Sequence, residues 1–137
     1  MSSETLLTLM IGALVFAFVM LNRSIRKRAR RVLTTRDTLD NEAFSRRYFR
    51  GREVQLAADI RAMLAPFITV DVSRVYPDDD LANDLQLGAI EGMGAKDFIA
   101  NLERLYHLKI PDQDAHNLRT VRQVVSYISR RLQSAGP

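Results

Sequence analysis

The side chains that could carry chemistry are few, and the two histidines are the first to weigh. His107 and His116 lie nine residues apart in expected loop or short-helix positions. A metal site needs several such ligands close together, but neither histidine has a second His at i+3 or i+4, and the chain has no cysteine. We interpret both as solvated or capping side chains. The lack of cysteine also excludes a disulfide framework and a cysteine nucleophile.

A cluster of carboxylates is the second candidate for chemistry. Asp78, Asp79, Asp80 and Asp84 lie close together in the sequence, but the glycine and terminal glutamate of a calcium-binding EF-hand loop are missing. Asp80 is instead well placed to cap a short helical turn. Phosphate-binding loops, nucleophile elbows and paired catalytic carboxylates are absent from the sequence. We therefore expect neither an enzyme nor a cofactor or metal site.

The positive charge of the chain is concentrated in one segment. The 137 residues carry a net charge of +4, but residues 22–52 alone carry +8, from eleven Lys and Arg against three acidic residues. Residues 1–21 carry −1 and residues 53–137 carry −3. These changes in composition divide the chain into a membrane anchor (1–22), a basic juxtamembrane segment (23–52) and a mildly acidic domain (53–134).

The first segment is apolar on every side. No charged residue occurs from Thr5 to Asn22, and this length of helix spans about 27 Å, close to the thickness of a bilayer core. A cleaved signal peptide normally begins with basic residues, whereas here the basic run follows the apolar one. A helix buried in a small protein would rarely be apolar all round. We predict a transmembrane helix, in which Ala13 and Ala17 could support weak self-association.

The residues after the apolar segment predict its orientation. Six basic residues follow it closely: Arg23, Arg26, Lys27, Arg28, Arg30 and Arg31. The positive-inside rule then makes the protein a single-pass protein of the bacterial inner membrane with a cytoplasmic C-terminal domain. These side chains should also attract anionic lipid headgroups. A nucleic-acid partner is not expected, because the cluster lacks interleaved aromatic residues.

Helical periodicity accounts for the rest of the chain. A short amphipathic helix is expected from Asn41, as its cap, through Phe49, lying either on the membrane or on the domain. Helices are expected at 53–65, 95–106 and 112–117, and a further helix should begin at a Thr120–Gln123 capping box. Leu105 and Leu132 are assigned to the buried faces of the second and last of these. The prediction is an all-α protein: one transmembrane helix plus a small four-helix bundle.

The order of these elements resembles the acyl and peptidyl carrier proteins. The resemblance covers residues 53–133 and is most specific over Leu102–Asp112, where the sequence reads LERLYHLKIPD. Upstream, the stretch 80–85 (DLANDL) looks like the approach to the family's prosthetic-group site. The resemblance implies a carrier-protein bundle.

One position departs from the family pattern. Carrier proteins attach phosphopantetheine to the serine of an Asp-Ser-Leu motif, and counting back from Leu102 places Glu91-Gly92-Met93 there. Gly92 has no hydroxyl, and no serine occurs between Ser73 and Ser126. About three extra residues also precede this position, in a stretch that glycines make flexible. We therefore expect no prosthetic group.

The resemblance also implies where a partner would bind. Carrier proteins meet their partners through the second helix and the loop before it, and the matching residues are Glu91, Met93, Lys96, Asp97, Asn101 and Arg104. The sequence thus predicts a membrane-anchored, non-catalytic interaction module, an accessory subunit that docks a cytoplasmic or membrane partner. The alternative is an acyl carrier or a protein that handles acyl chains or lipids without a covalent bond.

Overall fold

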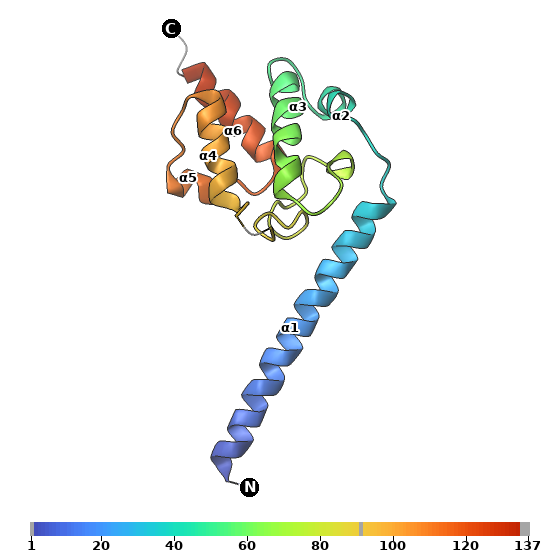
Figure 1. Ribbon diagram of the computed structural model, residues 1–137, viewed down its shortest axis with the longest axis vertical. Coiled ribbons are helices and arrows are strands. Elements are labelled where there is room, and N and C mark those ends of the chain that lie inside the picture. Colours follow the sequence, from blue (N-terminus) through green and yellow to red (C-terminus); the bar gives the residue numbers. More distant parts are fainter. Residues whose placement is uncertain (1, 91, 135–137) are drawn as a thin grey trace.

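The first helix extends away from a helical body formed by the rest of the chain (Figure 1). The computed structural model describes residues 2–90 and 92–134, with the backbone alone for residues 22 and 24–34. Over these residues the protein is all-helical and has no strand, in agreement with the predicted fold class.

Helix α1 (Ser3–Thr35) is continuous through the apolar and basic segments. The Ser2 hydroxyl accepts a hydrogen bond from the Thr5 N–H and caps its start. Its portion Ser3–Leu21 has a mean hydropathy of 2.2 and buries nothing against the body, so it is long and apolar enough to cross a membrane. The helix therefore continues beyond the apolar segment into the basic one. Arg36 is extended and ends it.

Helix α2 (Asn41–Tyr48) packs against α3 (Glu53–Leu64). The cap of α2 is Asp40, whose side chain accepts from the Ala43 N–H, so the prediction of an Asn41 cap is wrong by one residue. Phe44 and Phe49 are buried in the core. Of the two positions that the sequence allowed for this helix, the one on the domain is therefore correct. The core extends upstream of residue 53.

Between α3 and α4 the chain forms short turns instead of regular helices. Pro66 cannot continue the α-helical ladder, and a 3₁₀ turn forms at Ala65–Phe67. A second 3₁₀ turn, Val72–Arg74, is capped by the side chain of Asp71. Asp80 accepts hydrogen bonds from the N–H groups of Ala82 and Asn83, which confirms its predicted capping role. This loop is fastened to the chain before α6, because the Leu81 N–H donates to the Arg119 carbonyl at 2.8 Å.

Three further helices complete the body: α4 (Ala95–Tyr106), α5 (Asp112–His116) and α6 (Val121–Ser134). Thr120 caps the Gln123 N–H as expected, but the Gln123 side chain accepts from Arg119 instead of Thr120. Helices α3 and α6 contact each other directly. The core members are Phe44, Phe49, Ala57, Ile60, Leu64, Phe67, Ile68, Val75, Leu81, Leu85, Phe98, Leu102, Ile110, Val121, Val124, Val125 and Ile128.

Two leucines assigned to buried faces are not buried. Leu105 is 51% exposed and Leu132 is 37% exposed. Both lie at the edges of amphipathic stripes, where rotation of the helix on the core decides exposure and the periodicity alone does not.

Candidate docking site

The start of α4 is held by a local hydrogen bond. The Asp97 carboxylate accepts from the Gly94 N–H at 2.9 Å, which satisfies a donor that the helix leaves free. Phe98 and Leu102 are buried and fix the rotation of the helix on the core. The face opposite these two side chains is therefore presented to solvent.

The predicted partner-binding residues gather on that face. Lys96, Asp97 and Arg104 are exposed and Asn101 is half-buried. At about 100° per residue, these four positions share an arc of about 140° around the helix. Met93 precedes the helix, half-buried, and packs against the core. Glu91, the sixth predicted residue, lies outside the described residues.

The charges on this face differ in their availability. Over the described residues, Lys96 and Arg104 have neither a hydrogen bond nor an ion pair, whereas Asp97 is engaged at Gly94. A shallow hollow of about 490 Å³ lies beside Arg104, with Ala100, His107 and Lys109 among its lining residues. The face thus offers two unpaired cations, of which Arg104 lines the hollow.

Sequence reasoning missed one residue of this face. Leu105 follows Asn101 by one helical turn, and its 51% exposure is unusual for a leucine in the body of this protein. A single exposed leucine is ordinary on a protein surface, so its position beside Asn101 and Arg104 is what makes Leu105 a candidate contact. The sequence carried no signal for this exposure, since Leu105 lies next to buried Phe98 on a helical wheel and the apolar periodicity favours its burial.

The loop before α4 has a backbone unlike a helix start. Gln86, Gly88 and Gly92 all have positive φ, with values of 59°, 96° and 77°. Gly92 is exposed, lies three residues before the first residue of α4, and a Cβ there would meet nothing within 4 Å. There is space for a side chain at position 92, but Gly92 has no hydroxyl and does not lie at the first residue of a helix. The residues at this position do not fit a covalently attached phosphopantetheine.

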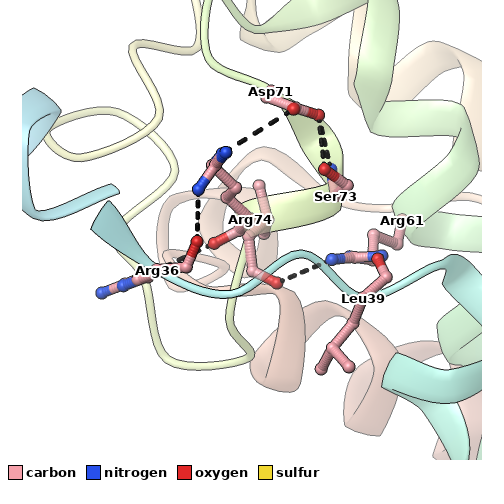
Figure 2. A network of polar contacts seen from close by, with 7 residues as sticks. Arg36, Leu39, Arg61, Asp71, Ser73 and Arg74 are labelled. Carbon is pink, nitrogen blue, oxygen red and sulfur yellow. Dashed lines mark hydrogen bonds and ion pairs between the residues drawn. The ribbon is translucent and has the colours of Figure 1, made fainter. Parts of the chain in front are cut away.

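Helix α3 carries a buried arginine that was not singled out from the sequence. Arg61 of α3 is 0% exposed, and Figure 2 shows its guanidinium beside Leu39. It donates hydrogen bonds to the carbonyls of Leu39 and Val75 at 2.8 and 3.2 Å and to the Asn41 side chain at 3.1 Å. Its guanidinium lies 4.3 Å from the centre of the Phe44 ring. Burial lowers the pKa of Arg61, which the charge of nearby Asp71 partly opposes.

The histidines and carboxylates considered for metal binding are dispersed. Over the described residues, no group of three or more His, Asp or Glu side chains is arranged to hold a metal ion. His107 has a left-handed backbone and ends α4, and His116 is exposed at the end of α5. Asp78 pairs with Arg122 at 2.8 Å, and Asp79 pairs with Arg36 at 2.7 Å.

The fold and this site define a carrier-protein-like helical domain, and comparison with known proteins agrees. The chain is 34% identical over 73 residues to an acyl carrier protein of Helicobacter pylori, matching 53% of this chain and 90% of that protein. It is 30% identical over 78 residues to that of Chlamydia caviae (57% and 97%) and 27% identical over 78 residues to that of Thermosynechococcus vestitus (57% and 93%). No family model matches. The chain belongs to the acyl carrier protein family.

Proposed function

We propose that this protein is a membrane-anchored, non-catalytic member of the acyl carrier protein family that docks a partner protein through α4. The observation that carries the proposal is Gly92 at the position of the carrier serine. A carrier-protein domain that cannot receive phosphopantetheine at that position still has the helix through which carrier proteins meet their partners. Its role is then that of an accessory subunit.

Helix α1 is the proposed anchor in the bacterial inner membrane. The stretch Ser3–Leu21 would span the bilayer, and the basic residues that follow would place the body in the cytoplasm. The same basic run would bind anionic headgroups, at about 1 kcal/mol for each well-placed side chain. Ala13 and Ala17 are exposed on the spanning part, where they could support weak pairing of two copies.

The proposed docking face is formed by Lys96, Asn101, Arg104 and Leu105. The two unpaired cations favour a partner that presents carboxylates, and exposed Leu105 supplies an apolar contact at the edge of this face. Nucleic acid is not proposed as the partner, since exposed aromatic side chains for base stacking do not accompany these cations over the described residues.

Charge reversal tests this face. Lys96→Glu combined with Arg104→Glu should reduce partner recovery from detergent-solubilised membranes at least tenfold, because two attractive contacts become repulsive. The matched control reverses Arg50 and Arg130, which are exposed elsewhere on the body. Equal recovery with both double variants would reject α4 as the docking face.

Family membership favours a second candidate, an acyl carrier or a protein that holds acyl chains without a covalent bond. Intact-mass measurement after co-expression with a phosphopantetheinyl transferase separates the two. An unchanged mass, with a serine-containing acyl carrier protein modified in the same cells, removes the covalent form. Co-purification of stoichiometric fatty acid with the detergent-extracted protein would instead support non-covalent binding.

A further inference from the structure

The first residue after α1 is Arg36, and its side chain is attached to the body. It forms an ion pair with Asp79 at 2.7 Å, and its guanidinium lies 4.3 Å from the centre of the Tyr76 ring. The side chain of Arg36 is 21% exposed and that of Asp79 is 7% exposed, so this pair is screened less than a surface ion pair. We name Arg36, Tyr76 and Asp79 the junction clamp.

The partners of Arg36 are themselves fixed on the body. The Asp79 carboxylate also accepts a hydrogen bond from the Tyr76 N–H at 2.7 Å, and the Tyr76 ring packs beside Tyr48 of α2, with ring centres 6.0 Å apart. The Arg36 carbonyl accepts a hydrogen bond from the side chain of Arg74 (Figure 2). Both the side chain and the backbone of Arg36 are therefore bound to the loop that follows α3.

A second attachment follows three residues later, at Leu39. Its N–H donates to the Ser73 carbonyl at 2.8 Å, and its carbonyl accepts from buried Arg61 at 2.8 Å. Asp37 and Thr38, which lie between the two attachments, are exposed. The segment between α1 and α2 is therefore a strap held at both ends, in contrast to a flexible linker whose residues are all solvated.

The direction of α1 relative to the body depends on this strap. The part Ser3–Leu21 buries nothing, and α1 extends away from the body (Figure 1). Helix α1 ends at Thr35, the residue directly before Arg36, so only the φ and ψ angles of this junction separate the helix from the clamp. Holding Arg36 on the body therefore restricts the direction in which the whole helix leaves it.

We infer that the junction clamp couples the direction of α1 to that of the body, so that the two move as one unit. A rotation or tilt of α1 is then carried to the exposed face of α4, whereas a flexible linker would let the body turn independently of the helix. The inference concerns how two parts of this chain are joined. It does not depend on the proposed docking face, and its test needs no partner.

Distances between spin labels measure this coupling in the full chain. The chain has no cysteine, so Leu21→Cys in α1 can be paired with Gln113→Cys in α5 or with Gln133→Cys in α6, all at exposed positions. In lipid nanodiscs, with excess unlabelled protein to suppress distances between copies, both pairs should give narrow distance distributions. A short Gly-Ser segment inserted between Thr35 and Arg36 should broaden both at least twofold, because it separates α1 from the clamp. Equally broad distributions without the insertion would overturn the inference.

The same insertion placed two residues later is the matched control. Between Asp37 and Thr38 it lengthens the strap but leaves Arg36 next to α1, so the distributions should stay as narrow as those of the unmodified chain. Adding Arg36→Gln to this second insertion should broaden them at least twofold, whereas adding Arg122→Gln, which breaks the exposed pair with Asp78, should not. Circular dichroism checks that each variant keeps its helices. Equal broadening by the two insertions would overturn the inference, as would distributions that stay narrow with Arg36→Gln.

Discussion

Arg61 of α3 connects this helix to the start of α2 and to the loop that carries Val75. Three acceptors from two separate segments converge on its guanidinium, and no carboxylate among the described residues is hydrogen-bonded to it. Carbonyl and amide oxygens, together with the Phe44 ring, therefore compensate the cost of burying the charge. Such a residue brings segments into register, because its hydrogen bonds join the start of α2 and the residues before it to the loop that carries Val75.

Replacing Arg61 tests this role. Arg61→Met keeps most of the apolar volume but leaves the carbonyls of Leu39 and Val75 without this donor, and we expect a loss of about 2–4 kcal/mol in the free energy of unfolding. Denaturant unfolding of the full chain in detergent measures it. Arg104→Met, at an exposed position without a partner, should change stability by less than about 0.5 kcal/mol. Equal losses in the free energy of unfolding for the two variants would show that Arg61 does not hold these segments together.

Tyr106 gives a pH dependence whose sign can be worked out. Burial, with the charge of Asp59 adding to it, raises the pKa of Tyr106 to about 12, and its hydroxyl has no hydrogen-bond partner over the described residues. The folded state therefore holds this proton more tightly than the unfolded chain, whose tyrosine titrates near 10.0. The stability it contributes is complete below about pH 10 and is lost as pH rises to about 12.

The variant Tyr106→Phe should lose less stability than the wild type between those pH values. At neutral pH it should be as stable as the wild type or more stable by up to about 1 kcal/mol, because no unpaired hydroxyl remains buried. Unfolding midpoints measured at pH 8, 10 and 11 provide the comparison. Identical pH slopes for the two proteins would contradict the assignment.

The role of a single residue could be predicted from the sequence only where its contacts lie nearby in the chain. The cap at Asp80 could be predicted because a residue and its next three neighbours determine it. Arg61 could not, because its acceptors lie more than ten residues away in sequence. Its position three residues before Leu64 and four after Ala57, both buried, was the available signal.

At the scale of elements, α4 was the most predictable and α2 the least. The bounds of α4 equal the expected 95–106, because Gly94 and the apolar stripe mark both its start and its face. The sequence of α2 allows two surfaces for its aromatic side, and only packing against α3 decides between them. The loop path was not predictable either, since positive φ at Gln86 follows from tertiary contacts and not from residue type.

The contribution of α2 to the stability of the body can be measured with fragments that begin at different residues. A fragment beginning at Arg36 retains Phe44, Phe49 and the acceptors of Arg61, and should unfold cooperatively. A fragment beginning at Glu53 lacks all of these and should lose on the order of 5 kcal/mol, most of the stability of a small domain. Circular dichroism during heating distinguishes them. Equal midpoints would place α2 outside the cooperative unit.

For the whole molecule, the placement of charge matters more than its sum. The net charge of +4 describes no part of the chain well, since the basic segment follows an apolar helix and the domain itself is acidic. Only the basic residues on α1 lie between the apolar stretch and the body, since Arg46 and Arg47 lie on α2, which packs against α3. This separation makes two kinds of membrane attachment distinguishable, one apolar and one ionic.

Deleting residues 2–21 should remove the apolar attachment to the membrane and leave only the ionic one. The full chain should remain in membranes through high salt and alkaline carbonate, because burial of the apolar helix does not depend on ionic strength. The shortened chain should be soluble, yet should bind vesicles rich in phosphatidylglycerol at low salt through the basic residues that follow Leu21. That binding should disappear near 1 M salt, where charges are screened beyond about 3 Å. Vesicle sedimentation measures both forms. Salt-resistant binding of the shortened chain to neutral vesicles would contradict the proposed anchor, because the domain would then hold the membrane by itself.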